Sequence, residues 1–194
     1  RISGGNTLNA LISLQDTATH WLDRVAGPLL PTLARLVFAG VLFSYYWASA
    51  ETKLGDGILG IVQPSMGAYA QIFPKAMEAA GYDVSQLGVF HWLVVVAGTW
   101  AEFILPVLIV IGLVTRLAAL GMVGFVVVQS WVDITGHGAD AATIGTWFDR
   151  DASSLILDQR AFWVFLLLYL VLRGPGPLSL DRLAVWRLRQ AESG

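Results

Sequence analysis

Four long apolar segments constrain the fold of this chain more than any other feature. They cover residues 29–50, 90–113, 117–134 and 155–172. Each approaches the length of about 20 mainly apolar residues that an α-helix needs to cross the hydrocarbon core of a bilayer. Backbone groups at that depth must be paired within the protein, which favours helices. We therefore predict an all-α fold, in which a four-helix transmembrane bundle occupies residues 29–173.

The composition agrees with a membrane protein and excludes several other classes. Hydrophobic residues make up 56% of the chain and charged residues only 13%, whereas a soluble domain carries about 25% charged residues. The net charge of −2 and the lack of a basic tract give no indication of a nucleic-acid partner. The chain has no cysteine, which excludes cysteine-ligated metal centres and disulfide relays. No phosphate-binding loop or hydrolase motif is present either. The apolar composition makes the lipid bilayer the predicted partner.

Both ends of the chain show amphipathic patterns. In residues 1–28, apolar positions between 8 and 25 fall near one helical face, and polar positions lie largely elsewhere. Residues 174–194 begin with a glycine- and proline-rich stop, after which Ser179 can cap a short helix rich in arginine. We predict helices that lie at the membrane surface. Frayed tails are the alternative.

Basic residues predict the orientation of the bundle, because cytoplasmic loops carry an excess of Lys and Arg. With four spans, one side holds six basic residues: Arg24, Arg116, Arg173, Arg182, Arg187 and Arg189. The other side holds four, which are diluted by acidic residues: Lys53, Lys75, Arg150 and Arg160. Both termini are therefore predicted to be cytoplasmic.

Two long connections fall on the opposite, outer side, at residues 51–89 and 135–154. The first is predicted to contain short helices at 65–73 and 75–80, separated at Pro74. These helices form either a lid over a site or an ordinary packing cap.

Polar residues inside the predicted spans are candidates for a functional site, because they are costly in hydrocarbon. Glu102 lies near the middle of the second span, and Gln129 of the third span has a similar depth. Arg35 of the first span is within reach of that layer for an extended side chain, and Ser44 and Tyr45 lie slightly further outward. Three interpretations remain open. The layer is a proton or quinone site, it is an ion pair that fixes helix packing, or Arg35 extends to the headgroups beside a protonated Glu102.

A second group of polar residues is predicted at the outer mouth of the bundle. It consists of His91, Asp133, His137, Asp158 and Arg160. Asp133 and His137 stand four positions apart and share a face if the third helix continues that far. Interfacial hydrogen bonding is one interpretation, and haem or metal ligation by the histidines is the other. No metal site is predicted from ligand spacing.

Three segments of the chain resemble the DoxX family of bacterial and archaeal membrane proteins. The first is Ala34-Arg35-Leu36 with the following 40–43 stretch and Lys53, and the second is Ala101-Glu102 followed by IGLVTRLAA at 111–119. The third is RGPGPLSLD at 173–181. The resemblance spans most of residues 32–183. It implies a four-helix membrane protein that works beside redox enzymes, in some cases as a subunit of a thiosulfate:quinone oxidoreductase.

The first functional hypothesis is therefore a subunit of a quinone-linked redox complex in the bacterial cytoplasmic membrane. No cofactor is certain from the sequence, and a quinone is the candidate. The second hypothesis is a non-catalytic accessory subunit that packs against other membrane subunits or forms a homo-oligomer. A small-molecule transporter is the weakest of the three, because no inverted repeat is visible.

Overall fold

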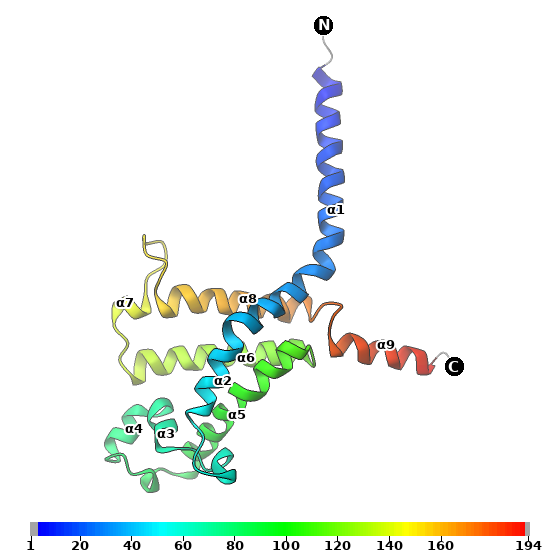
Figure 1. Cartoon of the computed structure of the whole chain (residues 1–194). Helices are drawn as coiled ribbons and strands as arrows, with labels where there is room; N and C mark the ends of the chain where they lie inside the picture. The colour runs from blue at the N-terminus through cyan, green and yellow to red at the C-terminus, as the bar shows by residue number, and fades with distance from the viewer. Residues whose placement is uncertain (1–3, 193–194) are drawn as a thin grey trace.

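A computed structural model describes residues 4–192, and in that range the chain contains helices and no β-strand (Figure 1). The α-helices are α1 Gly4–Phe38, α2 Ser44–Glu51, α3 Met66–Ile72, α4 Pro74–Ala79, α5 Val89–Ile111, α6 Thr115–Trp131, α7 Ala141–Ile144, α8 Arg160–Arg173 and α9 Leu180–Glu192. Three π-helical turns join or extend them, at Ala39–Phe43, Val132–Gly136 and Leu155–Gln159. Two 3-10 turns lie in the first long connection, at Ile58–Ile61 and Val84–Gln86.

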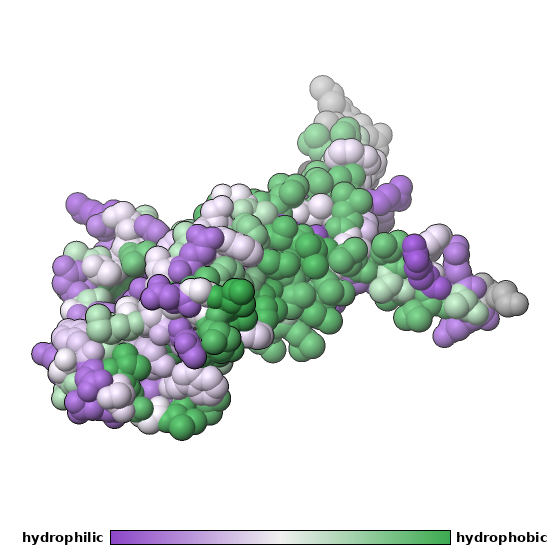
Figure 2. Space-filling view, turned by 60° about the horizontal axis from the view of Figure 1, so that its bottom comes forward, coloured by the Kyte–Doolittle hydropathy of each residue, from purple (hydrophilic) through white to green (hydrophobic). Residues whose placement is uncertain are grey.

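The described residues contain four helices that are long and apolar enough to cross a membrane, which confirms the predicted class of fold. They run over Asn9–Glu51, Val89–Ile111, Thr115–Gly136 and Leu155–Arg173. The first combines α1, a π-helical turn and α2, so that no break separates residues 4–28 from the first span. Hydrophobic residues cover the middle of the molecule, and hydrophilic residues gather at the end that carries α3 and α4 (Figure 2).

The bundle core forms where α6 packs between α5 and α8, with α1 and α2 beside them. Its largest fully buried side chains come from all four spans: Phe38, Leu42, Tyr46, Ile109, Met122, Val126, Leu167 and Leu170. Burying a side chain of this size from water stabilises by about 1.5–3 kcal/mol. Within a bilayer, close packing between the helices carries most of their association instead.

The first long connection packs as a cap on the outer half of α5. The predicted short helices are confirmed as α3 and α4, separated at Pro74. Tyr69 of α3 and Met77 of α4 form a second small core with Val95 of α5. In addition, the indole N–H of Trp100 on α5 donates to the carbonyl of Ile61 at 2.8 Å. The cap therefore fixes the outer end of α5 and one wall of the site described below.

At the opposite end of the bundle, the second and third family-like segments contact each other. The turn between α5 and α6 places Gly112 at φ 73° and Val114 at φ 43°, a left-handed conformation that is unfavourable for valine. The carboxylate of Asp181 accepts hydrogen bonds from the Val114 N–H at 2.7 Å and from the Thr115 N–H at 3.0 Å. A carboxylate at this position also stabilises the N-terminus of α6. These motif residues therefore close the bundle at one end.

The two terminal helices project from the bundle in different directions. The N-terminal part of α1 runs across the axes of α6 and α8, whereas α9 runs roughly along them (Figure 1). Pro28 and Pro31 lie inside α1, and proline is a common cause of such a change in helix direction. Ser179 accepts from the Arg182 N–H at 3.2 Å, as the sequence predicts for the start of α9. A surface position for both ends stays a prediction, and the direction of α9 does not favour it.

Candidate functional site

A cavity of about 440 Å³ lies between α5 and α6 in the outer half of the bundle. Its volume falls within the range of small-molecule pockets. We call it the α5–α6 groove, and it is lined by Ser49, Lys53, Gln71, Ile72, Val94, Ala97, Gly98, Ala101, Glu102, Gly121, Gly124, Phe125, Val128, Gln129, Val132, Asp133 and His137. Ala97, Gly124 and Val128 are exposed and lie within spanning helices. The groove therefore opens sideways, toward the region that lipid occupies.

Glycines on both helices make room for the groove. A Cβ atom built on Gly124 of α6 would meet nothing within 4 Å, and one on Gly98 of α5 would meet only Ile72 Cδ1, at 3.6 Å. A Cβ atom on Gly121 would lie 3.3 Å from the Leu105 methyl groups, so the glycine allows close packing of α5 on α6 at the inner end of the groove. The pair Gly121 and Gly124 therefore has two roles, of which the sequence indicated only close packing.

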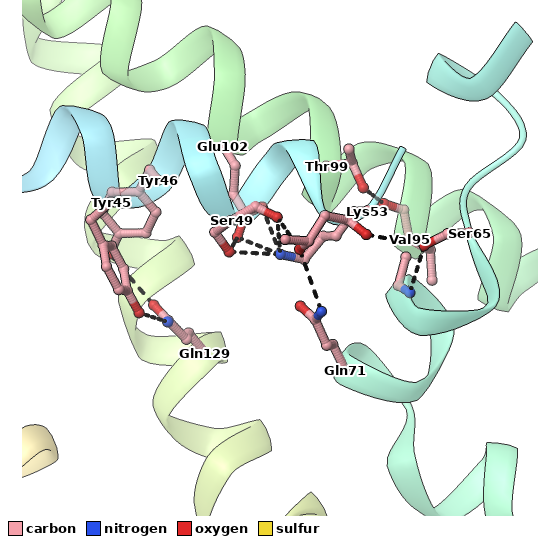
Figure 3. Close-up of polar contacts among 12 residues, drawn as sticks. Tyr45, Tyr46, Ser49, Lys53, Ser65, Gln71, Val95, Thr99, Glu102 and Gln129 are labelled. Carbon is pink, nitrogen blue, oxygen red and sulfur yellow. Dashed lines mark hydrogen bonds and ion pairs between the residues drawn. The ribbon is translucent and has the colours of Figure 1, made fainter. Parts of the chain in front are cut away.

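A buried ion pair forms the polar wall of the groove. The Lys53 ammonium lies 2.9 Å from Glu102 Oε2 and 3.1 Å from Oε1, and the two side chains are only 6% and 3% exposed (Figure 3). Ser49, one helical turn before Lys53, donates its hydroxyl to Glu102 Oε1 at 3.2 Å and accepts from the Lys53 ammonium at 2.8 Å. Both charges are thus balanced by a partner, which removes much of the cost of burying them.

Sequence reasoning missed Lys53 as the partner of Glu102. It places Lys53 just beyond the first span and Glu102 deep in the second, so that it assigns the two residues different depths. The cap changes this relation, because it covers the outer turns of α5 and brings the end of α2 against them. A lysine one turn after Ser49 and directly behind a span was the available signal. A lone cation at a span end is a candidate partner for an intramembrane acid.

Gln129 connects the groove to the aromatic side chains of α2. Its amide nitrogen donates to the Tyr45 hydroxyl at 3.0 Å, and its amide oxygen accepts from the Tyr46 hydroxyl at 3.4 Å (Figure 3). Tyr46 is fully buried and Tyr45 packs against Trp163. Ser44 begins α2 with an exposed side chain and lies outside the groove lining. The structure thus brings Gln129 and Glu102 to one cavity and leaves Ser44 out.

Two residues of the predicted outer mouth also line the groove. Asp133 Oδ2 lies 2.6 Å from the Arg160 guanidinium, which is 3% exposed and also donates to Ser130 at 3.1 Å. His137 Nε2 lies 2.9 Å from the carbonyl oxygen of Gln71 on α3. The π-helical turn Val132–Gly136 carries the third span far enough to place Asp133 and His137 on the same cavity. The two groups of polar residues therefore meet in one site.

The remaining outer-mouth candidates lie away from the groove. His91, near the start of α5, packs edge-on against Phe73 at 4.7 Å, and its buried Nδ1 has no hydrogen-bond partner within residues 4–192. Asp158 accepts from the backbone N–H and the hydroxyl of Ser154, at 3.0 and 2.7 Å. It stabilises the start of the fourth span. In the part of the chain that the structure describes, no three His, Asp or Glu side chains gather as metal ligands.

The structure does not bring Arg35 to Glu102. The Arg35 side chain is buried and points toward the other end of the bundle, where Nε donates to the Ile109 carbonyl at 2.9 Å. Its other nitrogens donate to the carbonyls of Val110, Pro175 and Leu178. Arg35 therefore ties the C-terminus of α5 to the loop after α8. Its geometry is that of a structural clamp, and the predicted polar layer contains a lysine in its place.

The fold and the groove define a class, namely a four-span helical membrane protein with a lipid-facing cavity that ends in a buried ion pair. The family model described as DoxX matches residues 30–133, which is more than half of the chain. The chain therefore belongs to the DoxX family. No curated protein and no solved structure matches the chain.

Proposed function

We propose that the protein binds a quinone in the α5–α6 groove, as a membrane subunit of a quinone-linked redox complex. The observation that carries the proposal is the position of the Lys53–Glu102 pair, at the polar wall of a cavity that opens to lipid. A quinone has a flat ring with two carbonyl acceptors and an apolar tail. The groove offers a matching pair of environments, with charged and amide groups inside and small apolar side chains at the opening.

Several side chains are placed to bind the carbonyl oxygens of a quinone. The Lys53 ammonium has three N–H groups but four acceptor atoms within 3.1 Å, so its protons are shared and can be redirected. The Gln129 amide has a second N–H beside the one that it donates to Tyr45. Glu102 is the group that can hold a proton next to these donors. Quinone reduction takes up two electrons and two protons, and in this proposal a partner protein supplies the electrons.

We further propose a bacterial cytoplasmic membrane with both termini on the cytoplasmic side. Two of the four outer basic residues, Lys53 and Arg160, are themselves buried and held in ion pairs. This leaves Lys75 and Arg150 as exposed basic residues of the outer side among those described. The excess of exposed positive charge at the other end is therefore larger than the sequence count of six against four suggests, and such an excess favours the cytoplasm.

Filling the groove should weaken quinone binding without loss of stability. Gly124→Leu places a side chain into open space on α6, and leucine is a better helix former than glycine. We expect the affinity for a short-chain ubiquinone, titrated by tryptophan fluorescence in detergent, to fall by at least about tenfold, as loss of one good contact predicts. Gly40→Leu is the matched control, because its Cβ also meets nothing within 4 Å and Gly40 lies outside the groove.

A second variant tests the polar wall of the same site. Glu102→Gln keeps the shape and the acceptor oxygen of the side chain but removes its charge. The proposal requires weaker quinone binding, and weaker quinone reduction by the intact complex. Unaltered binding in both Gly124→Leu and Glu102→Gln would overturn it.

A non-catalytic accessory subunit is the second candidate, and the exposed apolar side chains of α9 favour it. Leu183, Trp186 and Leu188 are 47%, 55% and 66% exposed on a helix that projects from the bundle (Figure 1). An amphipathic helix of this kind suits a groove on another protein. We expect Leu183→Ser/Trp186→Ser to reduce the partner subunits that co-purify in mild detergent, as quantified by mass spectrometry. Ile58→Ser/Leu59→Ser, at exposed outer positions, is the control, and a wild-type chain that runs as a stable monomer without partners would contradict this role.

A further inference from the structure

A second cavity, of about 470 Å³, lies at the end of the bundle opposite the α5–α6 groove. It is bounded by α1, the first turn of α6, the end of α8, the following loop and the start of α9. Its lining residues include Pro28, Pro31, Arg116, Arg173, Asp181 and Arg182. None of these residues belongs to the groove or to the proposed quinone site.

The charge of this cavity is positive and its arginines are available. Arg116, Arg173 and Arg182 are all exposed. The one lining carboxylate, Asp181, is already engaged, because it accepts from the Val114 and Thr115 N–H groups and from the Thr115 hydroxyl. Three guanidinium groups against one engaged carboxylate leave an excess of two positive charges.

The cavity is also preformed. The Arg116 guanidinium is held in place, because Nη1 donates to the carbonyls of Val171 and Leu172 at 2.9 and 3.0 Å, near the end of α8. The loop after α8 is fixed from behind by the Arg35 clamp and packs tightly on α1. A Cβ on Gly176 would lie 2.8 Å from Thr32 Oγ1. Arg116 and this loop therefore lose little conformational entropy when an anion binds.

The position of the cavity at the membrane boundary suits a lipid ligand. Arg116 follows the first residue of the third span and Arg173 is the last residue of the fourth, so both lie at one level of the membrane boundary. Next to the lining prolines, α1 exposes Leu29, Leu30 and Leu33, which are 53%, 43% and 45% exposed. Acyl chains can pack on these leucines while a phosphate group lies at the arginines. A soluble anion would leave that apolar surface uncovered.

We propose that this cavity is a specific site for the phosphate group of an anionic phospholipid. Guanidinium groups bind phosphate oxygens through paired hydrogen bonds. In a zwitterionic lipid, the cation of the headgroup is repelled by the arginines and weakens this binding. Basic pockets between spanning helices on the cytoplasmic side are suited to such headgroups. The site is independent of the groove, and its test does not depend on quinone binding.

Native mass spectrometry of the full chain in detergent, with added phosphatidylglycerol, phosphatidylcholine or inorganic phosphate, tests this proposal. We expect wild-type protein to retain phosphatidylglycerol in preference to phosphatidylcholine. Arg173→Gln/Arg182→Gln should lower the phosphatidylglycerol affinity about 30-fold, which corresponds to about 1 kcal/mol for each arginine. Arg187→Gln/Arg189→Gln is the matched control, since it removes the same charge from α9 outside the cavity and should retain the preference.

Three results would overturn the proposal. Equal losses in the two double variants would show general electrostatic attraction rather than a site. Binding of inorganic phosphate as tight as that of phosphatidylglycerol would show a site for a free anion. Equal retention of phosphatidylglycerol and phosphatidylcholine by the wild-type protein would show a lipid contact that does not select for charge.

Discussion

Replacing Lys53 with methionine should lower the free energy of unfolding by about 3–5 kcal/mol, because it leaves Glu102 buried without its partner. Glu102 is 3% exposed, and both of its oxygens accept from the Lys53 ammonium. Methionine preserves most of the length of the side chain, so the loss reflects the missing charge and hydrogen bonds. Unfolding of the purified protein in mixed micelles, followed by circular dichroism, measures the change.

The two lysines of the chain provide a matched pair for this experiment. Lys75, at the start of α4, is exposed, and Lys75→Met should change the stability by no more than about 0.5 kcal/mol. A double variant, Lys53→Met/Glu102→Leu, removes both charges and should regain much of the loss, since an apolar pair of similar volume can replace a buried ion pair. Equal unfolding curves for Lys53→Met and Lys75→Met would show that the pair does not hold the fold together.

Helix positions were predictable because they depend on local properties of the sequence. Length and hydropathy alone locate the four spans, and Pro74 separates α3 from α4 as proline geometry requires. Ser179 caps α9 for the same kind of reason. In each case the deciding interaction lies within a few residues along the chain.

The polar contacts were less predictable, because they depend on how the helices tilt and overlap. A depth counted along straight helices pairs Glu102 with Arg35, whereas the structure pairs it with Lys53 and sends Arg35 to the other end of the bundle. A cap of short helices was predicted over the outer end of the bundle, but not the extent to which this cap overlaps α5. It packs along α5 through Tyr69 and Trp100, so the partners of Glu102 come from the outer side. Tertiary contacts of this kind leave no periodic signal in the sequence.

The contacts of Arg35 are those of a structural residue, and experiment can distinguish this role from ligand binding. Its guanidinium donates to four carbonyls on two segments, at the C-terminus of α5 and in the loop after α8. The last carbonyls of a helix have no i→i+4 partner within the helix, so a cation placed there is stabilising. Arg35 therefore connects the first, second and fourth spans at one point, far from the α5–α6 groove.

We expect Arg35→Met to lower the free energy of unfolding by about 3 kcal/mol, because the partly buried carbonyls of Val110, Pro175 and Leu178 lose their donor, at about 1 kcal/mol or more for each. Arg35→Lys should rescue little of this loss, since an ammonium group cannot span carbonyls that a planar guanidinium reaches with three nitrogens. Arg24→Met, at an exposed position on the same helix, is the control. The quinone affinity of the folded fraction of Arg35→Met should equal that of the wild type. A variant that kept its stability and lost quinone binding would instead place Arg35 in the ligand site. It would contradict the proposal that Lys53 is the cation that binds the quinone.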